Sequence, residues 1–213
     1  MPQLLRLCVI FFAFVSGNFA IAQSIDVNSC VTSKYAFLTG NQVDNNFIVA
    51  GGILSPIDSS KNEIELRCYP FSEYGNDASV IVLESNLKEA YLSVIEYAFK
   101  SAPVYPGWKR VGQTANGLFI FVYRKSKKVD LCDFMNPLIK NDFFTLTGNK
   151  KETLGKPGPK GREVWFEAKY LTKIRGFKYD ATNADSDKER GLKVSRIYNQ
   201  FMYYKPTQNH GNN

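Results

Sequence analysis

Two stretches of the chain alternate largely between apolar and polar side chains, and this pattern constrains the fold more than any other feature. In residues 63–69, three apolar side chains share one face of an extended chain: Ile64, Leu66 and Cys68. Three charged side chains share the other face: Glu63, Glu65 and Arg67. Residues 163–173 alternate in the same way. A period of two residues predicts strands that turn one face to a core and the other to solvent.

The segment at 86–101 shows a different spacing. Its apolar residues recur three and four positions apart: Leu87, Ala90, Tyr91, Val94 and Ala98. Asn86 and Glu89 match a capping box, and Pro103 follows the segment. We therefore predict a central helix at about 86–101.

A second helix is predicted near the end of the chain, at about 187–204. Five residues fit the spacing of an amphipathic helix: Val194, Ile197, Tyr198, Phe201 and Met202. Ser186 and Glu189 match a second capping box, and Pro206 ends the segment.

Short apolar runs predict the remaining strands, at residues 30–38, 46–54, 78–83, 129–134 and 142–147. Asn116 and Gly117 predict a hairpin turn between strands at 108–113 and 118–124. Strands, a helix, more strands and a second helix thus follow one another along the chain. This order predicts an α+β domain, mainly an antiparallel sheet with a central and a C-terminal helix.

The first 22 residues have the features of a cleavable secretory signal peptide. Arg6 precedes a continuous apolar run at 7–15, and Ala20 and Ala22 form a small-x-small cleavage pattern. The alternative is an uncleaved membrane anchor, but Arg6 and Asn18 interrupt the ~20 apolar residues that a spanning helix needs. We expect a secreted or periplasmic chain with no transmembrane segment after cleavage. It would form a single domain at 23–206, with division into an acidic part at 23–99 and a basic part at 100–206 as the alternative, and a disordered tail at 207–213.

The charge is distributed unevenly between the two halves of the expected mature chain. Residues 23–99 hold four basic and ten acidic residues, a net charge of −6. Residues 100–213 hold 22 basic and ten acidic residues, a net charge of +12. This asymmetry indicates a basic surface that faces an anionic partner, two halves that attract each other, or simply lysines on solvated faces.

Three cysteines remain once Cys8 leaves with the signal peptide: Cys30, Cys68 and Cys132. Export to an oxidising compartment predicts one disulfide among them. Three pairings are open, and each leaves one thiol over. Cys68 shares the apolar face of its strand, so it is a candidate for a core bridge or a buried free thiol.

Histidine-dependent catalysis is disfavoured, because the only histidine is His210 in the expected tail. The chain has no CxxC motif, and we expect neither a metal site nor a cofactor. Acid/base chemistry by two carboxylates stays open. Glu63 and Glu65 share a strand face, although the pattern places that face toward solvent.

The strongest positive signal is a mixture of cations and aromatic rings in residues 165–179. Within it, Trp165 lies among four cations: Lys169, Lys173, Arg175 and Lys178. A Gly/Pro/Lys loop before it adds three more: Lys156, Lys160 and Arg162. Cations beside flat rings suit a polyanion or a sugar. These eight residues form the predicted binding surface, with an ordinary strand bearing a lysine-rich outer face as the alternative.

The sequence therefore predicts an exported, non-catalytic binding module. Its basic, aromatic-rich second half would dock on an anionic polymer, a lipid headgroup or a protein partner. Nucleic acid is disfavoured because the protein leaves the cytoplasm. A carboxylate-dependent secreted hydrolase and an accessory subunit of the cell envelope are the alternatives.

Overall fold

The computed structural model describes residues 53–70, 77–101, 106–146, 163–180 and 188–206. Within these ranges the chain forms a seven-stranded antiparallel sheet and two α-helices, which confirms the predicted α+β class. In chain order the elements are the 3-10 turn η2 (Ile57–Ser59), strands β1 (Ile64–Tyr69), β2 (Asp77–Ser85), β3 (Ala90–Lys100), β4 (Lys109–Gln113) and β5 (Phe119–Val129), helix α3 (Leu131–Lys140), strands β6 (Glu163–Tyr170) and β7 (Lys173–Asp180), and helix α4 (Lys188–Tyr204).

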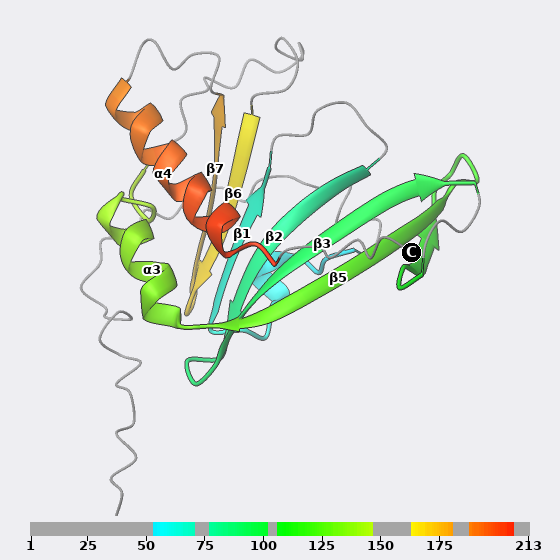
Figure 1. Cartoon of the computed structure of the whole chain (residues 1–213), viewed down its shortest axis with the longest axis horizontal. Helices are drawn as coiled ribbons and strands as arrows, with labels where there is room; N and C mark the ends of the chain where they lie inside the picture. Colours follow the sequence, from blue (N-terminus) through cyan, green and yellow to red (C-terminus); the bar gives the residue numbers. More distant parts are fainter. Residues whose placement is uncertain (1–52, 71–76, 102–105, 147–162, 181–187, 207–213) are drawn as a thin grey trace, which may run out of the picture.

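The strands lie in the order β4-β5-β3-β2-β1-β6-β7. Both helices pack on one face of the sheet, and the long strands β3 and β5 extend away from them toward β4 (Figure 1). The sheet thus has a helix-covered face, an opposite face that we call the helix-free face, and an outer edge formed by β4 and β5.

The core under the helices is strongly aromatic. The Phe201 ring of α4 has its centroid 5.2 Å from that of Phe134 on α3 and 5.9 Å from that of Phe166 on β6. The Phe143 ring, just after α3, lies 5.8 Å from Phe166 at an interplanar angle of 90°. Edge-to-face pairs at such distances are favourable, so these rings tie both helices to the sheet.

The helix-free face has a smaller core of its own. Five buried side chains form it: Tyr69, Val80, Val82, Ile95 and Tyr97. Ile53 and Leu54 pack against this cluster, and Ile57 of η2 is buried. The segment that contains η2 therefore covers part of the sheet face opposite the helices.

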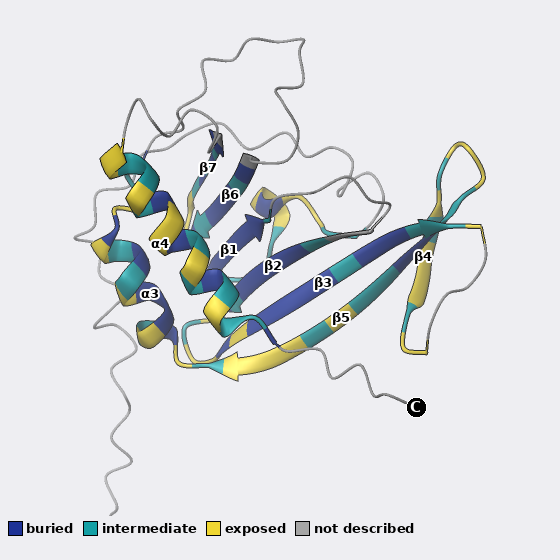
Figure 2. Cartoon of the chain, turned by 45° about the horizontal axis from the view of Figure 1, so that its top comes forward, coloured by how far each residue is buried: buried dark blue, intermediate teal, exposed yellow. Residues whose placement is uncertain are grey.

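The central helix predicted at 86–101 is wrong, because this segment forms strand β3. Both faces of β3 are buried over most of its length, as the dark blue colouring in Figure 2 shows. Leu92 and Val94 face the helices, while Ser93 and Ile95 face the other side. A strand buried on both faces reads as a continuous apolar run, in which helical spacing also finds matches.

Asn86, interpreted as a helix cap, does make cap-like contacts, but in the turn between β2 and β3. Its side-chain Oδ1 accepts hydrogen bonds from the backbone N–H groups of Lys88 and Glu89, at 3.0 and 2.9 Å. Asn favours turns and helix N-termini for the same physical reason, which is local bonding between side chain and backbone. The capping signal was therefore ambiguous.

The central helix is instead α3, where strands were predicted at 129–134 and 142–147. The carboxylate of Asp130 accepts a hydrogen bond from the backbone N–H of Asp133 at 2.9 Å and caps the helix. Pro137 lies inside α3 and weakens its helical pattern in the sequence. Residues 141–146 form turns rather than a strand.

Strands β1, β2, β4, β5 and β6 and helix α4 agree with the sequence predictions, whereas η2 and β7 were not predicted. The hairpin around Gly117 forms, and α4 buries the expected Val194, Ile197 and Phe201. The alternating run at 163–173 is divided by a turn at Leu171 and Thr172, so that Lys173 begins β7. The predicted strand at 30–38 and most of the one at 46–54 lie outside the described residues.

The two described cysteines differ in state. Cys68 is a buried free thiol, as one of its two predicted roles required. Burial raises its pKa well above the ordinary value. Cys132 is bonded in a disulfide whose other half is not among the described residues. Cys30 lies outside these residues, so the pairing stays a prediction.

Candidate functional site

The predicted binding residues do not gather on one surface. Lys156, Lys160 and Arg162 lie outside the described residues. The other five belong to the β6–β7 hairpin, whose alternation sends them to opposite faces of the sheet. Trp165, Lys169 and Lys178 lie on the helix-free face, and Lys173 and Arg175 lie on the other.

The prediction that Arg175 belongs to the binding surface is wrong. Its side chain is buried, and only 3% of the residue is exposed. Its guanidinium donates hydrogen bonds to the backbone carbonyls of Phe143, at 3.1 Å, and Leu146. Burial lowers the pKa of Arg175 to about 10. This side chain fixes the turns after α3 against β7 and is closed to an external anion.

Lys169 and Lys178 make contacts within the fold. The Lys169 ammonium donates a hydrogen bond to the backbone carbonyl of Ser60, next to η2. The Lys178 ammonium lies 3.9 Å from the centroid of the Trp165 ring, in a cation–π contact. Lys173 is exposed. The predicted mixture of cations and rings therefore exists locally, but it does not form a continuous basic surface.

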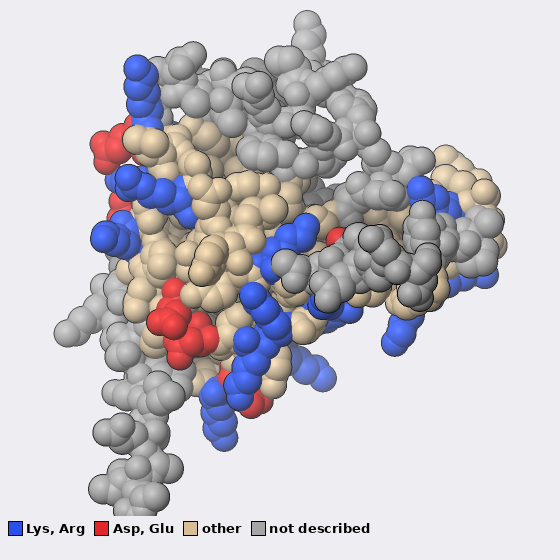
Figure 3. Space-filling view, in the orientation of Figure 1, with Lys and Arg blue, Asp and Glu red and all other residues tan. Residues whose placement is uncertain are grey.

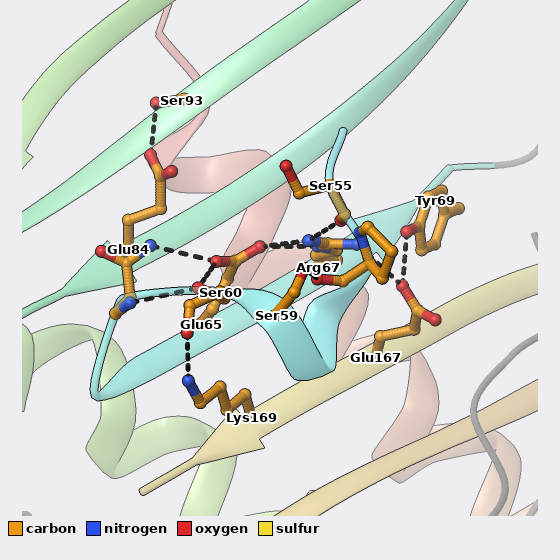
Figure 4. Close-up of polar contacts among 12 residues, drawn as sticks. Ser55, Ser59, Ser60, Glu65, Arg67, Tyr69, Glu84, Ser93, Glu167 and Lys169 are labelled. Atoms are coloured by element: carbon orange, nitrogen blue, oxygen red, sulfur yellow. Dashed lines mark hydrogen bonds and ion pairs between the residues drawn. The ribbon is translucent and has the colours of Figure 1, made fainter. Parts of the chain in front are cut away.

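A network of buried charged residues occupies the helix-free face between β1 and β6 (Figure 4). The Arg67 side chain lies 2.6 Å from a Glu65 carboxylate oxygen and 3.4 Å from a Glu167 carboxylate oxygen. The Tyr69 hydroxyl donates a hydrogen bond to Glu167 at 2.5 Å. The exposed fractions of Arg67, Glu65 and Glu167 are 2, 4 and 5%. The prediction that the charged face of β1 is solvated is therefore wrong for Glu65 and Arg67.

The same network fastens the η2 segment onto the sheet. Arg67 donates a hydrogen bond to the backbone carbonyl of Ser55 at 2.8 Å. Ser60 and Asn62 donate hydrogen bonds to Glu65, the latter at 3.0 Å. Each buried charge thus has partners, as the interior of a protein requires.

Two opposing effects set the pKa values of this network. Burial raises the pKa of Glu167, against the hydrogen bond from Tyr69 and the attraction of Arg67. Burial is the largest single effect on Arg67 and opposes its charge, but the attraction and hydrogen bonds of Glu65 and Tyr69 together outweigh burial, so the pKa of Arg67 is raised. The arrangement is that of a structural clamp, because Arg67 occupies the space between the two carboxylates.

The structure does gather basic side chains at another place, the outer edge of the sheet. Strands β4 and β5 carry six cations and no acidic residue: Lys109, Arg110, Arg124, Lys125, Lys127 and Lys128. We call these two strands and their turn the cationic hairpin. Figure 3 shows Lys and Arg side chains along this edge.

Some of these cations form ion pairs, whereas others form none with the described residues. Arg124 forms an ion pair with Glu84, and Lys128 pairs with Glu89 at 2.8 Å. In the part of the chain that the structure describes, no ion pair involves Lys109, Arg110 or Lys127. These three side chains are exposed.

Aromatic rings support the cationic hairpin from within. The Arg110 guanidinium lies 3.8 Å from the centroid of the Phe119 ring, and the Lys127 ammonium lies 5.6 Å from that of Tyr204 on α4. The Trp108 and Tyr123 rings pair at 6.0 Å across the hairpin. Cations held over ring faces keep their full charge while their side chains become more ordered.

No family model, curated protein or solved structure matches this chain. Among the described residues, no helix is both long and apolar enough to cross a membrane, and no group of three or more potential ligands could hold a metal ion.

The sequence predicted the hairpin as two strands and a turn, but the predicted binding surface did not include its cations. A usable signal was present, since no acidic residue lies between Glu96 and Asp130. The binding surface was predicted at residues 165–179 because aromatic rings and cations are neighbours in that part of the sequence. In a strand, however, adjacent residues face opposite sides, so that proximity in sequence does not make a surface.

Proposed function

We propose that this chain is an exported, non-catalytic module that docks on an anionic surface through the cationic hairpin. The observation that carries the proposal is the presence of six cations and no carboxylate on β4 and β5. The export part rests on the signal-like residues 1–22. The anionic chemistry would be a dense array of phosphate or sulfate groups, either on a membrane or on a polymer.

The position of the hairpin supports docking. Strand β4 and the adjoining part of β5 lie at the outer edge of the sheet, away from α3 and α4, whereas Lys127 near the end of β5 lies beside Tyr204 of α4 (Figure 2). The β4 residues are exposed or half-buried throughout. Lys109 and Arg110 alternate between the two faces of this edge strand and are both exposed. An extended anion array that wraps around the edge can therefore approach both, and each contact releases counterions from the array.

The hydrolase alternative receives less support from the geometry. The buried carboxylates Glu65 and Glu167 both bind Arg67, and the η2 segment is fastened over them. A general acid and base need room for a substrate and a proton path between them. The Arg67 guanidinium fills that position.

The test compares two variants of residues 23–213 with equal loss of charge. In the hairpin variant, Lys109→Gln, Arg110→Gln and Lys127→Gln remove the three exposed cations without an ion pair. In the control variant, Lys140→Gln, Lys188→Gln and Arg196→Gln remove three exposed cations from the helices. Binding to heparin and to vesicles of anionic or neutral lipid is measured across a salt series.

We expect wild type to bind the anionic probes with a steep salt dependence, and neutral vesicles weakly. The hairpin variant should lose affinity, and its log–log salt slope should fall by about one for each contact removed. The control variant should stay close to wild type. Equal losses in the two variants would reduce the effect to net charge and overturn the proposal. Preference for heparin or for vesicles identifies the source of the anionic groups.

A further inference from the structure

A groove of about 340 Å³ opens on the helix-free face. It shares Arg124 and Ser126 with the cationic hairpin but does not include Lys109, Arg110 or Lys127. The turn between β2 and β3, strand β5 and the residues before β1 surround it. Six side chains matter for its chemistry: Asn62, Glu84, Glu89, Tyr91, Arg124 and Ser126. Its volume is at the lower end of the range for small-ligand sites.

One rim of the groove is held in place by local hydrogen bonds. The Ser85 hydroxyl accepts a hydrogen bond from the backbone N–H of Leu87 at 3.1 Å, and Asn86 accepts two more in the same turn. Leu87 has a φ of 69°, in the left-handed region that a residue of this type rarely adopts. Its side chain packs against the main core. The rim thus keeps a defined shape before any ligand arrives.

Hydroxyl groups extend inward from the groove to the sheet. Ser126 lines the groove, and its hydroxyl oxygen lies 2.8 Å from the hydroxyl oxygen of Ser93. Ser93 is fully buried. The Arg124 guanidinium donates a hydrogen bond to the same Ser93 hydroxyl at 3.1 Å. These bonds fix the position of Arg124 and Ser126, and buried partners of this kind improve the precision of a binding site.

The charges around the groove balance one another. Glu84 pairs with Arg124, and Glu89 pairs with Lys128. The hydrogen bond from Lys128 lowers the pKa of Glu89, so this carboxylate stays ionised and accepts hydrogen bonds rather than supplying a proton. A site with two anions and two cations favours a ligand that is polar but carries no net charge.

One aromatic ring completes the lining. Tyr91 is 40% exposed, and its hydroxyl donates a hydrogen bond to Glu89 at 3.3 Å. An exposed aromatic side chain beside fixed donors and acceptors is suited to a ligand with an apolar face and a polar rim.

We propose that this groove binds a neutral saccharide, with Tyr91 against the C–H face of one sugar ring. Sugar hydroxyls both donate and accept hydrogen bonds, so they match a lining that contains carboxylates, an amide, a hydroxyl and a guanidinium. The proposal goes beyond the docking function, because a neutral ligand is not recognised by net charge. A surface that carries both sugars and anionic groups would engage the groove and the hairpin together.

The test first screens residues 23–213 against an array of neutral and sulfated glycans. Titration calorimetry then measures the affinity for each neutral glycan that binds. Tyr91→Ala removes the ring, Tyr91→Phe retains it, and Tyr203→Ala is the control because Tyr203 is 81% exposed on α4. We expect neutral glycans to bind with little dependence on salt. Tyr91→Ala should weaken binding about tenfold or more, whereas Tyr91→Phe and Tyr203→Ala should stay close to wild type.

Three results would overturn the proposal: no neutral glycan binds, Tyr91→Ala and Tyr203→Ala weaken binding alike, or only sulfated glycans bind. The last result would leave the docking function in place, since it depends on the hairpin. Conversely, loss of heparin binding in the hairpin variant with unchanged neutral-glycan binding would separate the two sites.

Discussion

Arg67 is the residue on which the helix-free face depends most. It lies between two carboxylates and also bonds the backbone of the η2 segment. Buried ion pairs gain little over apolar packing, but removing one partner leaves an uncompensated charge in the interior. The network is therefore sensitive to loss of its cation in a way that an exposed ion pair is not.

We predict that Arg67→Met lowers the free energy of unfolding by about 3–5 kcal/mol at neutral pH. The loss should shrink as the pH falls. Burial already raises the pKa of Glu167, and removing the nearby positive charge raises it further. When the pKa of a carboxyl group is higher in the folded protein than in the unfolded chain, protonation of that group stabilises the folded protein. This stabilisation is complete at pH values below the pKa of the unfolded chain, and it is lost as the pH rises through the pKa of the folded protein. Urea unfolding at a series of pH values measures both effects.

The matched control is Arg124→Met, which removes the cation of an ion pair in which the side chains are partly exposed. Its cost should be about 1 kcal/mol or less, with a weak pH dependence. A similar cost for both substitutions would contradict the assignment of Arg67 as the centre of a buried network.

This network also shows where prediction from sequence stops at the residue scale. The alternation of β1 correctly placed Ile64, Leu66 and Cys68 in the main core. It placed Glu65 and Arg67 toward solvent, because charged residues at alternate positions are typical of an exposed face. The η2 segment that covers them has no periodic pattern, so the local sequence does not predict that this segment packs over Glu65 and Arg67.

At the scale of elements, periodicity succeeded where only one face of an element is apolar. The strands β1 and β6 and the helix α4 have one apolar face and were found. Strand β3 is buried on both sides, and Tyr91, Val94 and Ala98 satisfied helical spacing by coincidence. Helix α3 was not predicted, because Pro137 inside it is a residue that disfavours the interior of a helix. In both errors tertiary burial decided the structure, and local patterns do not report tertiary burial.

The end of α3 has a geometry that its sequence does not favour. The backbone N–H of Phe143 bonds the Leu138 carbonyl at 3.0 Å, and that of Asp142 bonds the Ile139 carbonyl at 3.0 Å. This is a Schellman motif, with Asp142 at the left-handed position and a φ of 59°. Glycine is preferred there because it lacks a Cβ.

We predict that Asp142→Gly raises the free energy of unfolding by about 0.5–1 kcal/mol. The substitution removes an exposed ion pair with Lys193, which offsets only a few tenths of this gain. Thermal and urea unfolding measure the change. Lys140→Gly, two residues earlier and exposed within the helix, should instead lower stability by about 1 kcal/mol. If both glycines destabilise, strain at Asp142 is not a significant cost.

At the scale of the whole molecule, stability and proposed binding use different parts of the fold. The aromatic core under α3 and α4 and the Arg67 network hold the sheet together, whereas the exposed cations of the hairpin contribute charge at its outer edge. Sequence asymmetry predicted a basic half. It did not predict which cations would reach the surface, because Arg175 enters the interior and only the fold shows that.

We therefore predict that binding and stability can be changed independently. The hairpin variant should lose no more than about 1–2 kcal/mol of its free energy of unfolding, because it removes two exposed cation–π contacts worth about 0.5–1 kcal/mol each and no buried contact. It should nevertheless lose most of its salt-dependent binding to heparin or anionic vesicles. Phe201→Ala should show the reverse: a stability loss of about 3–5 kcal/mol from the cavity in the aromatic core, with anion binding retained wherever the protein stays folded. Urea unfolding and the binding series on the same samples measure both quantities. A hairpin variant that unfolds as readily as Phe201→Ala would show that the outer edge is part of the structural core, and its loss of binding would then follow from loss of the fold.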